Sequence, residues 1–576
     1  MKKVLGLLLS LLSSFAYAGD FDGALDPDFG TDGRVIANFG AQDMDATSLA
    51  VVNRHDGKIV IGGSVETATG SDFGLIILDE DGTLEQAKQQ HIGLVGSVDV
   101  IVGLAVQPDN KIIAVGSTND LMSTSSFVVV RYTQDGDLDP TFNPTGSTPG
   151  VKLVDFFGAS LAQARAVAFK RDGRIVVVGD AQDASLLPGN QNVFYAVAVL
   201  NSDGSLDNSF AGGAGRAVYS DVMPVGGIAN ISSTATSVGI QSIGTTDNIV
   251  LAGQGEQDLN TFHFQIVRIT CDGNLDLTFN NNGVDQVVFN DDINELASGV
   301  DIYPDGRIVA VGTSFVPAGE EIVTTRRLVN GGPDNSFNGD GEASFALTDT
   351  SLNGNAVNIQ NDEKILIAGL HEDVIDGDKR FVLVRYTNAG VLDTTFGGNP
   401  GPGFVVTDFG GTPPNNEANG TALQQDGKVV LAGVTQLADG EPTDFAVARY
   451  LNDNTEEDVF VAPTIDSPQK LSNCNSNPPI LSGKAQNPSN ITVYINGNEA
   501  GRVITTGDQN EWTFTPAAPL AEGPNTFQVV AEYKSGNMNV CSDPSCCGVC
   551  LGPQSCISEA IREKYCPSCI DFPIGC

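Results

Sequence analysis

The stretch Asp172-Gly-Arg-Ile-Val-Val-Val-Gly179 decides the fold, because variants of it recur along the chain. Each copy begins with Asp, continues through Lys or Arg in most cases, and then runs through apolar residues to a Gly. The copies start at Asp56, Asp109, Asp172, Asp247, Asp305, Asp362 and Asp426. The fourth copy is one residue shorter than the others. Seven copies of one supersecondary unit indicate a repeat architecture.

Each unit is expected to form four short strands. The Asp-Gly step is typical of a hairpin turn, and the apolar run after it lacks polar alternation, so both of its faces should be buried. A strand with small residues, such as Gly103-Leu-Ala-Val106, precedes the motif. A third strand ends in Arg-Tyr, as in Phe127–Tyr132, and a fourth follows a Leu-Asp-x-x-Phe turn, as in Gly403–Phe409. This all-β pattern predicts a seven-bladed β-propeller, with an open solenoid as the alternative.

The two ends of the repeat region favour a closed ring. Residues 22–29 carry the turn that elsewhere follows Arg-Tyr, and the last unit stops at Arg449-Tyr450 just before such a turn. The sequence therefore predicts that Arg34–Phe39 pairs with Phe445–Tyr450 and completes the last blade. Closure of this kind removes two exposed sheet edges.

These motifs resemble the delta-60 repeat family of exported bacterial proteins, with its pattern of Leu-Asp-x-x-Phe-Gly, Asp-Gly-Lys-Ile-x-x-x-Gly and Arg-Tyr-x-x-Asp-Gly. The resemblance covers residues 19–455. It implies a propeller-like fold and brings no established catalytic residues.

A second domain is expected at residues 462–540. Alternating strands with Gly, Pro and Asn turns replace the repeat there, which predicts a small β-sandwich. This segment looks like the bacterial immunoglobulin-like modules of surface proteins and adhesins. Trp512 is the only Trp of the chain, and we expect it to be a core anchor rather than a binding aromatic residue.

The start of the chain indicates export. Residues 1–18 combine Met1-Lys2-Lys3, an apolar run and the small-residue site Ala16-Tyr17-Ala18, which is typical of a secretory signal peptide. We therefore expect a secreted protein or one of the bacterial cell envelope or surface, without direct membrane insertion. The formal net charge of -41 makes nucleic acid an unsuitable partner, because phosphates require Lys and Arg for neutralisation.

Cysteines are concentrated near the C-terminus, in a cysteine-rich tail at residues 541–576. The candidates for disulfides are Cys474, Cys541, Cys546, Cys547, Cys550, Cys556, Cys566, Cys569 and Cys576. An exported chain favours disulfides, with Cys474 and Cys541 as the pair expected to join the ends of the sandwich. The spacing of Cys547-x2-Cys550 and Cys566-x2-Cys569 also permits zinc, and cross-linking to other envelope proteins is a third alternative.

Motifs for catalysis or cofactor binding are missing from the sequence. None of the four His lies in a metalloprotease motif, and neither a nucleophile elbow nor a phosphate loop is present. His55 is expected to be a solvated turn residue. Asp-Gly-x-Leu-Asp turns at Asp22, Asp135, Asp203 and Asp272 could suggest calcium, but Asp also caps such turns, so we expect structural turns and no cofactor.

One departure from the repeat could mark a site. At a position where other units place Ala or Gly (Ala50, Ala105, Ala168, Gly239 and Ala422), two neighbouring units place Asp301 and Asn358. This pair could bind a ligand or cation in a central channel. A hydrogen-bonded pair between blades is the favoured interpretation, since buried polar groups are usually satisfied.

Together these features predict an exported binding or adhesion-type protein that presents a propeller face to a glycan or a protein. The competing hypothesis is a propeller hydrolase or lyase with carboxylates in the channel, because propeller enzymes draw their residues from scattered loops.

Overall fold

A computed structural model describes most of the repeat region and parts of the C-terminal region. The described residues are 22–39, 45–92, 97–119, 125–159, 161–183, 192–220, 232–244, 246–258, 261–290, 294–317, 319–397, 402–438, 440–452, 481–484, 489–495, 498–504, 511–515, 524–525, 527–533, 538–541 and 574–575. The expected signal peptide lies outside them.

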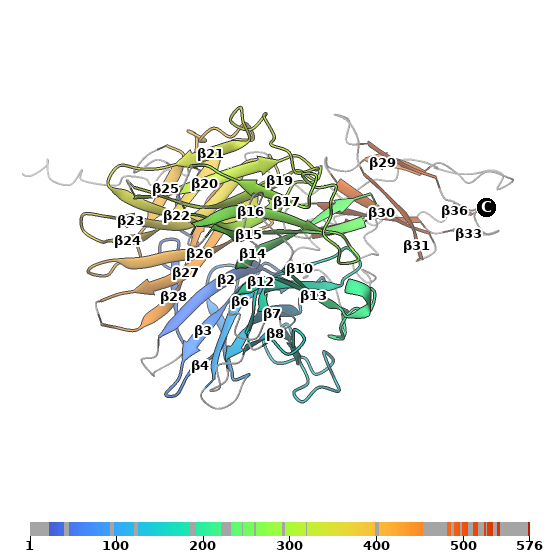
Figure 1. Cartoon of the computed structure of the whole chain (residues 1–576), viewed down its shortest axis with the longest axis horizontal. Helices are drawn as coiled ribbons and strands as arrows, with labels where there is room; N and C mark the ends of the chain where they lie inside the picture. Colours follow the sequence, from blue (N-terminus) through green and yellow to red (C-terminus); the bar gives the residue numbers. More distant parts are fainter. Residues whose placement is uncertain are drawn as a thin grey trace, which may run out of the picture.

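The repeat region consists of four-stranded antiparallel units (Figure 1). Units 1 and 2 contain β2 (Ala46–Asn53), β3 (Ile59–Glu66), β4 (Ser71–Leu78) and β5 (Leu84–Gln90), then β6 (Val98–Val106), β7 (Ile112–Asn119), β8 (Ser125–Tyr132) and β9 (Val151–Val154). Units 3 and 4 contain β10 (Ala162–Phe169), β11 (Ile175–Gln182), β12 (Val193–Leu200) and β13 (Arg216–Tyr219), then β14 (Ser233–Ile243), β15 (Thr246–Asp258), β16 (Thr261–Ile269) and β17 (Val284–Val287).

Units 5 and 6 contain β18 (Glu295–Ile302), β19 (Ile308–Val316), β20 (Gly319–Arg327) and β21 (Glu342–Phe345), then β22 (Thr350–Ile359), β23 (Ile365–Asp373), β24 (Lys379–Tyr386) and β25 (Phe404–Thr407). Unit 7 contains β26 (Asn415–Leu423), β27 (Val429–Gln436) and β28 (Thr443–Tyr450), and β1 (Arg34–Ala37) is its outer strand. Within the described residues the only helical element is the short 3-10 turn Ala211–Gly213.

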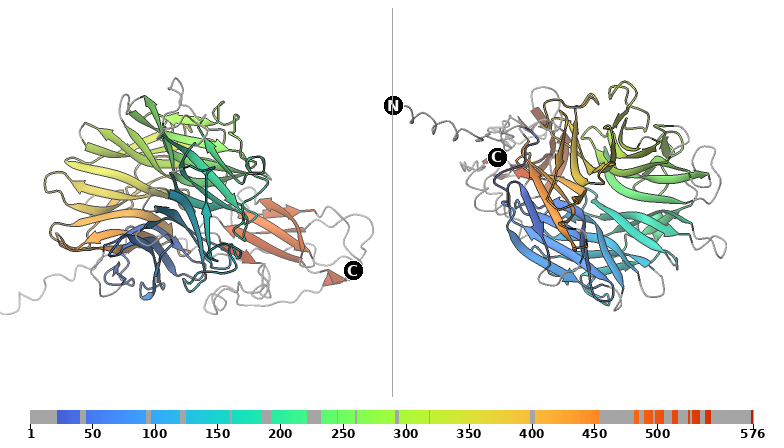
Figure 2. Two further views of the ribbon diagram at one scale, coloured as in Figure 1. Left: turned by 60° about the horizontal axis from the view of Figure 1, so that its bottom comes forward. Right: turned by 90° about the vertical axis from the view of Figure 1, so that its left-hand side faces the viewer.

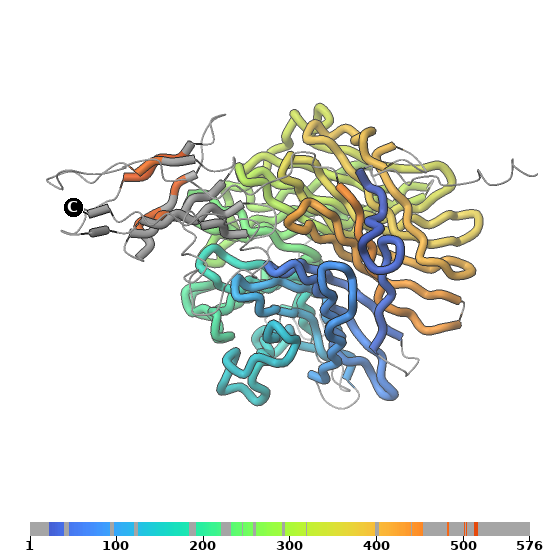
Figure 3. Tube along the Cα trace, turned by 180° about the vertical axis from the view of Figure 1, so that it is seen from behind, coloured from blue at the N-terminus to red at the C-terminus, as the bar shows by residue number. Residues whose placement is uncertain are grey.

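The N-terminal strand β1 completes unit 7, as the sequence predicts. Its register places Arg34 opposite Ala448 and Ala37 opposite Phe445, and Figure 3 shows this segment beside the last strands of the repeat region. The turn before it is also assembled from both ends of the region. The N–H of Gly23 donates to the carbonyl of Leu451 over 2.8 Å, and the N–H of Leu451 donates to Ala24 over 2.7 Å.

The first strands of successive units pack against one another, and β26 of unit 7 packs against β2 of unit 1. In Figure 2 the units follow each other from blue through green and yellow to orange, which lies beside blue again. The sheets are not joined into one closed sheet. Only single parallel pairs, Ser71 with Val98 and Lys379 with Asn415, link two units by a ladder. Packing between units, rather than continuous strand pairing, therefore holds them together.

A shared β-bulge explains the last Gly of the motif. In every first strand the register skips one residue, namely Leu49, Val102, Arg165, Thr236, Ser298, Asn355 and Asn419. The motif Gly lies opposite, and a Cβ there would be 1.8 to 2.0 Å from the carbonyl oxygen two residues before the bulge. In unit 5, for example, Gly312 faces the carbonyl of Leu296. Close approach of the backbone, not a left-handed φ, therefore requires Gly.

The apolar motif strands are buried on both faces, as expected. Val177 packs into the cluster shared with unit 2, whereas Val176 and Val178 pack into the cluster shared with unit 4. Small residues after the bulge bring neighbouring first strands together. A Cβ on Gly103 would lie 3.1 Å from the Cα of Ala166 in unit 3. The predicted close approach of neighbouring sheets is therefore present.

The C-terminal strands form separate small sheets. β29 (Leu481–Lys484) pairs with β32 (Glu511–Phe514), and a second sheet has the order β31 (Asn498–Ile504), β30 (Ser489–Ile495), β34 (Phe527–Tyr533) and β35 (Met538–Cys541). β33 (Pro524–Asn525) pairs with β36 (Ile574–Gly575). Trp512 is only 2% exposed, so its prediction as a buried anchor is confirmed.

Candidate functional site

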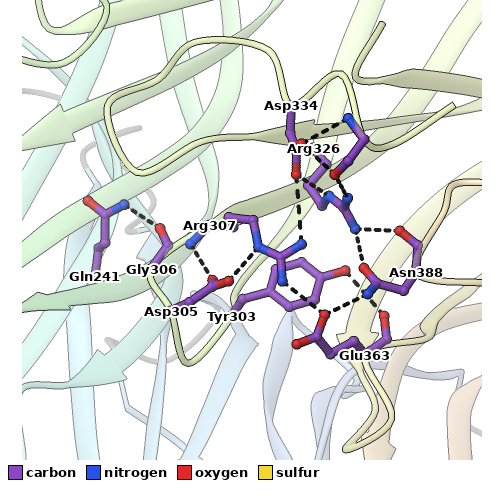
Figure 4. A network of polar contacts seen from close by, with 10 residues as sticks. Gln241, Tyr303, Asp305, Gly306, Arg307, Arg326, Asp334, Glu363 and Asn388 are labelled. Atoms are coloured by element: carbon purple, nitrogen blue, oxygen red, sulfur yellow. Dashed lines mark hydrogen bonds and ion pairs between the residues drawn. The ribbon is translucent and has the colours of Figure 1, made fainter. Parts of the chain in front are cut away.

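Arginines at the ends of the third strands hold the units together, and Figure 4 shows the arrangement in unit 5. Arg326 donates from Nε to Asp334 over 2.8 Å and from Nη2 to Ser336 over 2.7 Å. Its Nη1 crosses to unit 6 and donates to the carbonyl of Asn388 over 2.6 Å. The guanidinium also lies over the Phe337 ring. One buried cation thus fixes the Pro333–Phe337 turn, which is the unit 5 form of the Leu-Asp-x-x-Phe turn, and the neighbouring unit.

The Asp of each such turn is held as an anion. In unit 2, Asp139 accepts hydrogen bonds from the N–H and Oγ1 of Thr141, and it pairs with Arg131 at 2.8 Å and with Lys111 of the motif at 3.2 Å. Burial raises the pKa of Asp139, but the hydrogen bonds and cations outweigh burial and lower it to about 2. The charged residues of the repeat therefore build the fold.

A cation crosses every boundary between units, although its position in the sequence changes. In five units it is the strand-ending Arg, namely Arg131, Arg268, Arg326, Arg385 and Arg449. Units 1 and 3 carry Ile77 and Val199 at that place. There the cation is two residues before the motif Asp. Arg54 donates to the carbonyl of Gln134 over 2.5 Å, and Lys170 donates to the carbonyl of Cys271 over 3.1 Å.

Asp301 and Asn358 lie on neighbouring first strands, and the Asp301 carboxylate reaches the backbone beside Asn358. Asp301 accepts the N–H of Ile302 over 2.7 Å and the N–H of Ile359, in unit 6, over 2.9 Å. The Oδ1 of Asn358 is buried without a hydrogen-bond partner. Asp301 thus ties β18 to β22. The bulge register also corrects the alignment of unit 1, where Val52 rather than Ala50 is equivalent to Asp301.

His55 is not a solvated turn residue, so that prediction is wrong. It is half-buried where three units meet. Its N–H donates to Asn110 of unit 2 over 3.0 Å, and its carbonyl accepts Gln425 of unit 7 over 3.1 Å. Burial lowers the pKa of His55.

The Asp-Gly turns use their carboxylates locally. Asp203 accepts the N–H of Ser205 over 2.9 Å and its Oγ over 2.6 Å, which agrees with a structural turn. The candidate disulfide cysteines lie outside the residues whose side chains the structure describes, and only the backbone of Cys541 is placed. Cys271, in the repeat region, is a half-buried free thiol.

Two acidic clusters at the ends of the strands were missed by sequence reasoning. Asp72, His91 and Asp99 lie where units 1 and 2 meet, with the Nδ1 of His91 2.8 Å from Asp72 and 3.6 Å from Asp99. Glu295 in unit 5 is fully buried, and burial is the main reason why its pKa rises to about 7. These residues are far apart in sequence or occupy no motif, so no sequence signal identifies them.

Only one class of connection in the repeat region has a nearly constant length. On the motif face, six of the turns between first and second strands have equal length, namely 54–58, 107–111, 170–174, 303–307, 360–364 and 424–428. On the opposite face the connections between second and third strands range from the two residues 317–318 to the ten residues 183–192. Val374 and Ile375, in one of these connections, are 55% and 74% exposed. The connections between third and fourth strands, which lie on the motif face, also differ in length, from the five residues 79–83 to the eighteen residues 133–150.

Comparison with known proteins agrees with this architecture. Residues 55–86, 107–142, 170–210, 360–396 and 424–454 match the model described as domain of unknown function (DUF5122) beta-propeller. Over these residues the chain is similar to this beta-propeller family. Residues 459–543 match a bacterial Ig-like domain, so both sequence resemblances are confirmed. No curated protein matches the chain.

Several solved structures are similar to the propeller region. A protein of unknown function from Dyadobacter fermentans has 12% identity and a TM-score of 0.38, with 74% of this chain and 100% of that chain covered. The polysaccharide lyase Uly1 has 12% identity and a TM-score of 0.40, with coverages of 77% and 94%. A gluconolactonase from Xanthomonas campestris has 12% identity and a TM-score of 0.29, with coverages of 74% and 97%. Similarity this low gives no information on function.

Proposed function

We propose that the chain is an exported surface or envelope binding protein whose closed, seven-bladed propeller presents the face opposite the cation clamps to a glycan or a protein. In this proposal residues 19–455 are the propeller, 462–540 the immunoglobulin-like spacer and 541–576 a disulfide-linked tail. The signal-peptide pattern of residues 1–18 and the match to a bacterial Ig-like domain support a place outside the cytoplasm. No helix among the described residues is long and apolar enough to cross a membrane.

The exposed apolar pair Val374 and Ile375, on the face opposite the cation clamps, is the observation that carries the proposal. On one face the repeated Asp, Lys and Arg residues are engaged in clamps such as Arg131 with Asp139, which fix the geometry of every unit. On the other face the connections differ from unit to unit and expose apolar side chains such as Val374 and Ile375. A rigid scaffold that carries variable loops is the usual arrangement of a recognition surface.

The geometry around the first strands supports binding over catalysis. A hydrolase or lyase would need carboxylates free to act on substrate, and Asp301 was the candidate. Two backbone N–H groups occupy both of its oxygens, which suits a structural tie better than a general base. The strongly acidic chain further favours neutral or cationic partners over polyanions.

The experiment is a binding screen of the purified mature protein against neutral glycans, basic proteins and polyanions at two salt concentrations. The paired substitution Val374→Ser with Ile375→Ser should weaken binding of the partner found. Leu277→Ser is the matched control, since Leu277 is 64% exposed on the motif face and its loss should leave binding unchanged. The proposal would be refuted if both variants changed binding equally, or if the protein bound DNA or heparin in a salt-sensitive way. It would also be refuted if the protein turned over a substrate and Asp301→Asn lost that turnover.

A further inference from the structure

Glu295 is a buried carboxylate with only one of its oxygens satisfied. It opens β18 and is 0% exposed. Its Oε1 accepts the N–H of Phe289 over 2.9 Å and the N–H of Asn290 over 2.7 Å, so it ties the end of unit 4 to unit 5. Its Oε2 is equally buried and has no hydrogen-bond partner. Leaving such an oxygen without a donor is costly.

Other oxygen-bearing side chains stand next to this carboxylate. The strand register pairs Glu295 with Ser314 and Ser314 with Glu321, so the three side chains form a row on one face of β18, β19 and β20. Asn290 completes the group, because its Nδ2 donates to Ser314 Oγ and to Glu321 Oε1, each over 3.1 Å. We call Asn290, Glu295, Ser314 and Glu321 the 4/5 cluster.

The 4/5 cluster holds negative charge without a basic partner. Among the described residues neither Glu295 nor Glu321 forms an ion pair with Lys, Arg or His. Besides burial, the charges of Glu342 and Glu321 raise the pKa of Glu295. Glu342 has its own cation, since Arg327 donates to it over 2.9 Å. The uncompensated charge is therefore that of Glu295 with Glu321.

Unit 2 has a buried carboxylate at the equivalent position, with a basic side chain near it. Asp99 occupies the equivalent place in unit 2, three residues before the bulge, and is also 0% exposed. Its Oδ2 accepts the N–H of Ile92 over 2.9 Å, as Glu295 accepts that of Phe289. However, the imidazole of His91 lies 3.6 Å from this oxygen. Unit 2 thus places a group that can carry positive charge beside its buried carboxylate, whereas the described residues of unit 5 place none beside Glu295.

We propose that the 4/5 cluster binds a divalent cation of the calcium type, held by Glu295 Oε2 and a Glu321 oxygen, with Asn290 Oδ1 and Ser314 Oγ available to add. Hard oxygen ligands of mixed carboxylate, amide and hydroxyl type are those that Ca²⁺ prefers. The site differs from the Asp-Gly turns, whose carboxylates are occupied by their own backbone. This inference does not depend on the proposed binding function.

Bound cation would replace the proton that burial favours on Glu295, so affinity should rise with pH. It would also fix the junction of units 4 and 5, and hence stabilise the folded chain by mass action. Both effects have readouts that need no knowledge of the protein's partner.

The test uses the EDTA-treated mature protein and Ca²⁺ alone, followed by calorimetric titration and thermal unfolding at pH 8 and pH 5.5 in moderate salt. One saturable ion and a higher Tm are expected at pH 8, with affinity at least tenfold weaker at pH 5.5. Glu295→Gln should abolish binding, and Glu321→Gln should weaken it at least tenfold. Glu321 is half-exposed, so this second variant should fold even if the first does not.

Asp99→Asn is the matched control, because it removes the sister carboxylate and leaves the 4/5 cluster intact. It should keep the full Ca²⁺ response. Absence of binding at pH 8 would overturn the inference. An equal response in the wild type and in Glu321→Gln would also overturn it, because the ion would then be bound by other carboxylates of this acidic chain.

Discussion

Two substitutions in unit 2 should first remove and then partly restore the cation that links it to unit 3. Arg131→Val gives unit 2 the residue that unit 3 carries at Val199. It removes the hydrogen bonds to Asp139, Thr141 and the carbonyl of Ser202, at 2.8, 2.8 and 2.5 Å. Asp139 would remain buried, at 3% exposed, with Lys111 as its remaining cation.

The expected loss of unfolding free energy is about 3 kcal/mol. Removing one partner of a buried ion pair typically costs about 3–5 kcal/mol, and Lys111 keeps the effect near the lower end. Adding Gln107→Lys copies Lys170 of unit 3 and should restore the bond to Ser202, returning about 1.5 kcal/mol as for a hydrogen bond to a charged group.

Urea unfolding of the wild type, Arg131→Val, Gln107→Lys and the double variant measures this directly. The double variant should lie between Arg131→Val and the wild type, whereas Gln107→Lys alone should not stabilise. If the double variant is no more stable than Arg131→Val, the two cation positions are not equivalent and the reasoning fails.

Replacing Gly312 with Ala should lower Tm by several degrees, because the new Cβ would lie 1.8 Å from the Leu296 carbonyl oxygen. In the same melting experiment Gly332→Ala should have little effect, because its Cβ would lie 3.5 Å from the nearest atom. Deleting residues 19–37 should raise amide hydrogen exchange in β26–β28 more than in β10–β13, and equal exchange would contradict closure by β1. Acid should also destabilise the fold. The pKa of Asp139 is lowered from 3.8 to about 2, so its carboxylate adds about 2 kcal/mol to the free energy of unfolding at pH values above 3.8. This contribution is lost as the pH falls toward about 2. The free energy of unfolding, measured by denaturation at a series of pH values, should therefore depend less steeply on pH below pH 4 in Asp139→Asn than in the wild type.

The sequence predicts the features that repeat. The Asp-Gly turns, the apolar motif strands and the pairing of Arg34–Ala37 with β28 follow from residue patterns present in many copies. The bulge could not be foreseen, because a skipped backbone residue leaves no side-chain signature. Only its consequence, the invariant Gly exemplified by Gly312, is visible in the sequence.

Residues that break the repeat were harder to interpret. His55 precedes a turn motif and looks exposed, yet units 2 and 7 close over it. Glu295 stands where other units have residues such as Ala162 or Ser233. Its importance depends on burial by the end of unit 4 and on Glu321 across two strands, which sequence spacing does not encode. Asp301 departs from the repeat in the sequence, and the structure shows that it accepts a backbone N–H beside Asn358.

The turn shared by the two ends of the repeat region allows a different unit to come first in the chain. Asn452 and Asp22 occupy consecutive positions of one Asp-Gly turn, as Gln134 and Asp135 do in unit 2, and Gly23 and Leu451 are already hydrogen-bonded across it. Joining Asn452 directly to Asp22 would recreate an uninterrupted turn without a linker. The chain could then be opened at another turn, giving circular permutants with new termini and the same set of contacts. Every unit could then come first in such a permutant, because the junction of β28 with β1 is already held by the same backbone hydrogen bonds as the other turns.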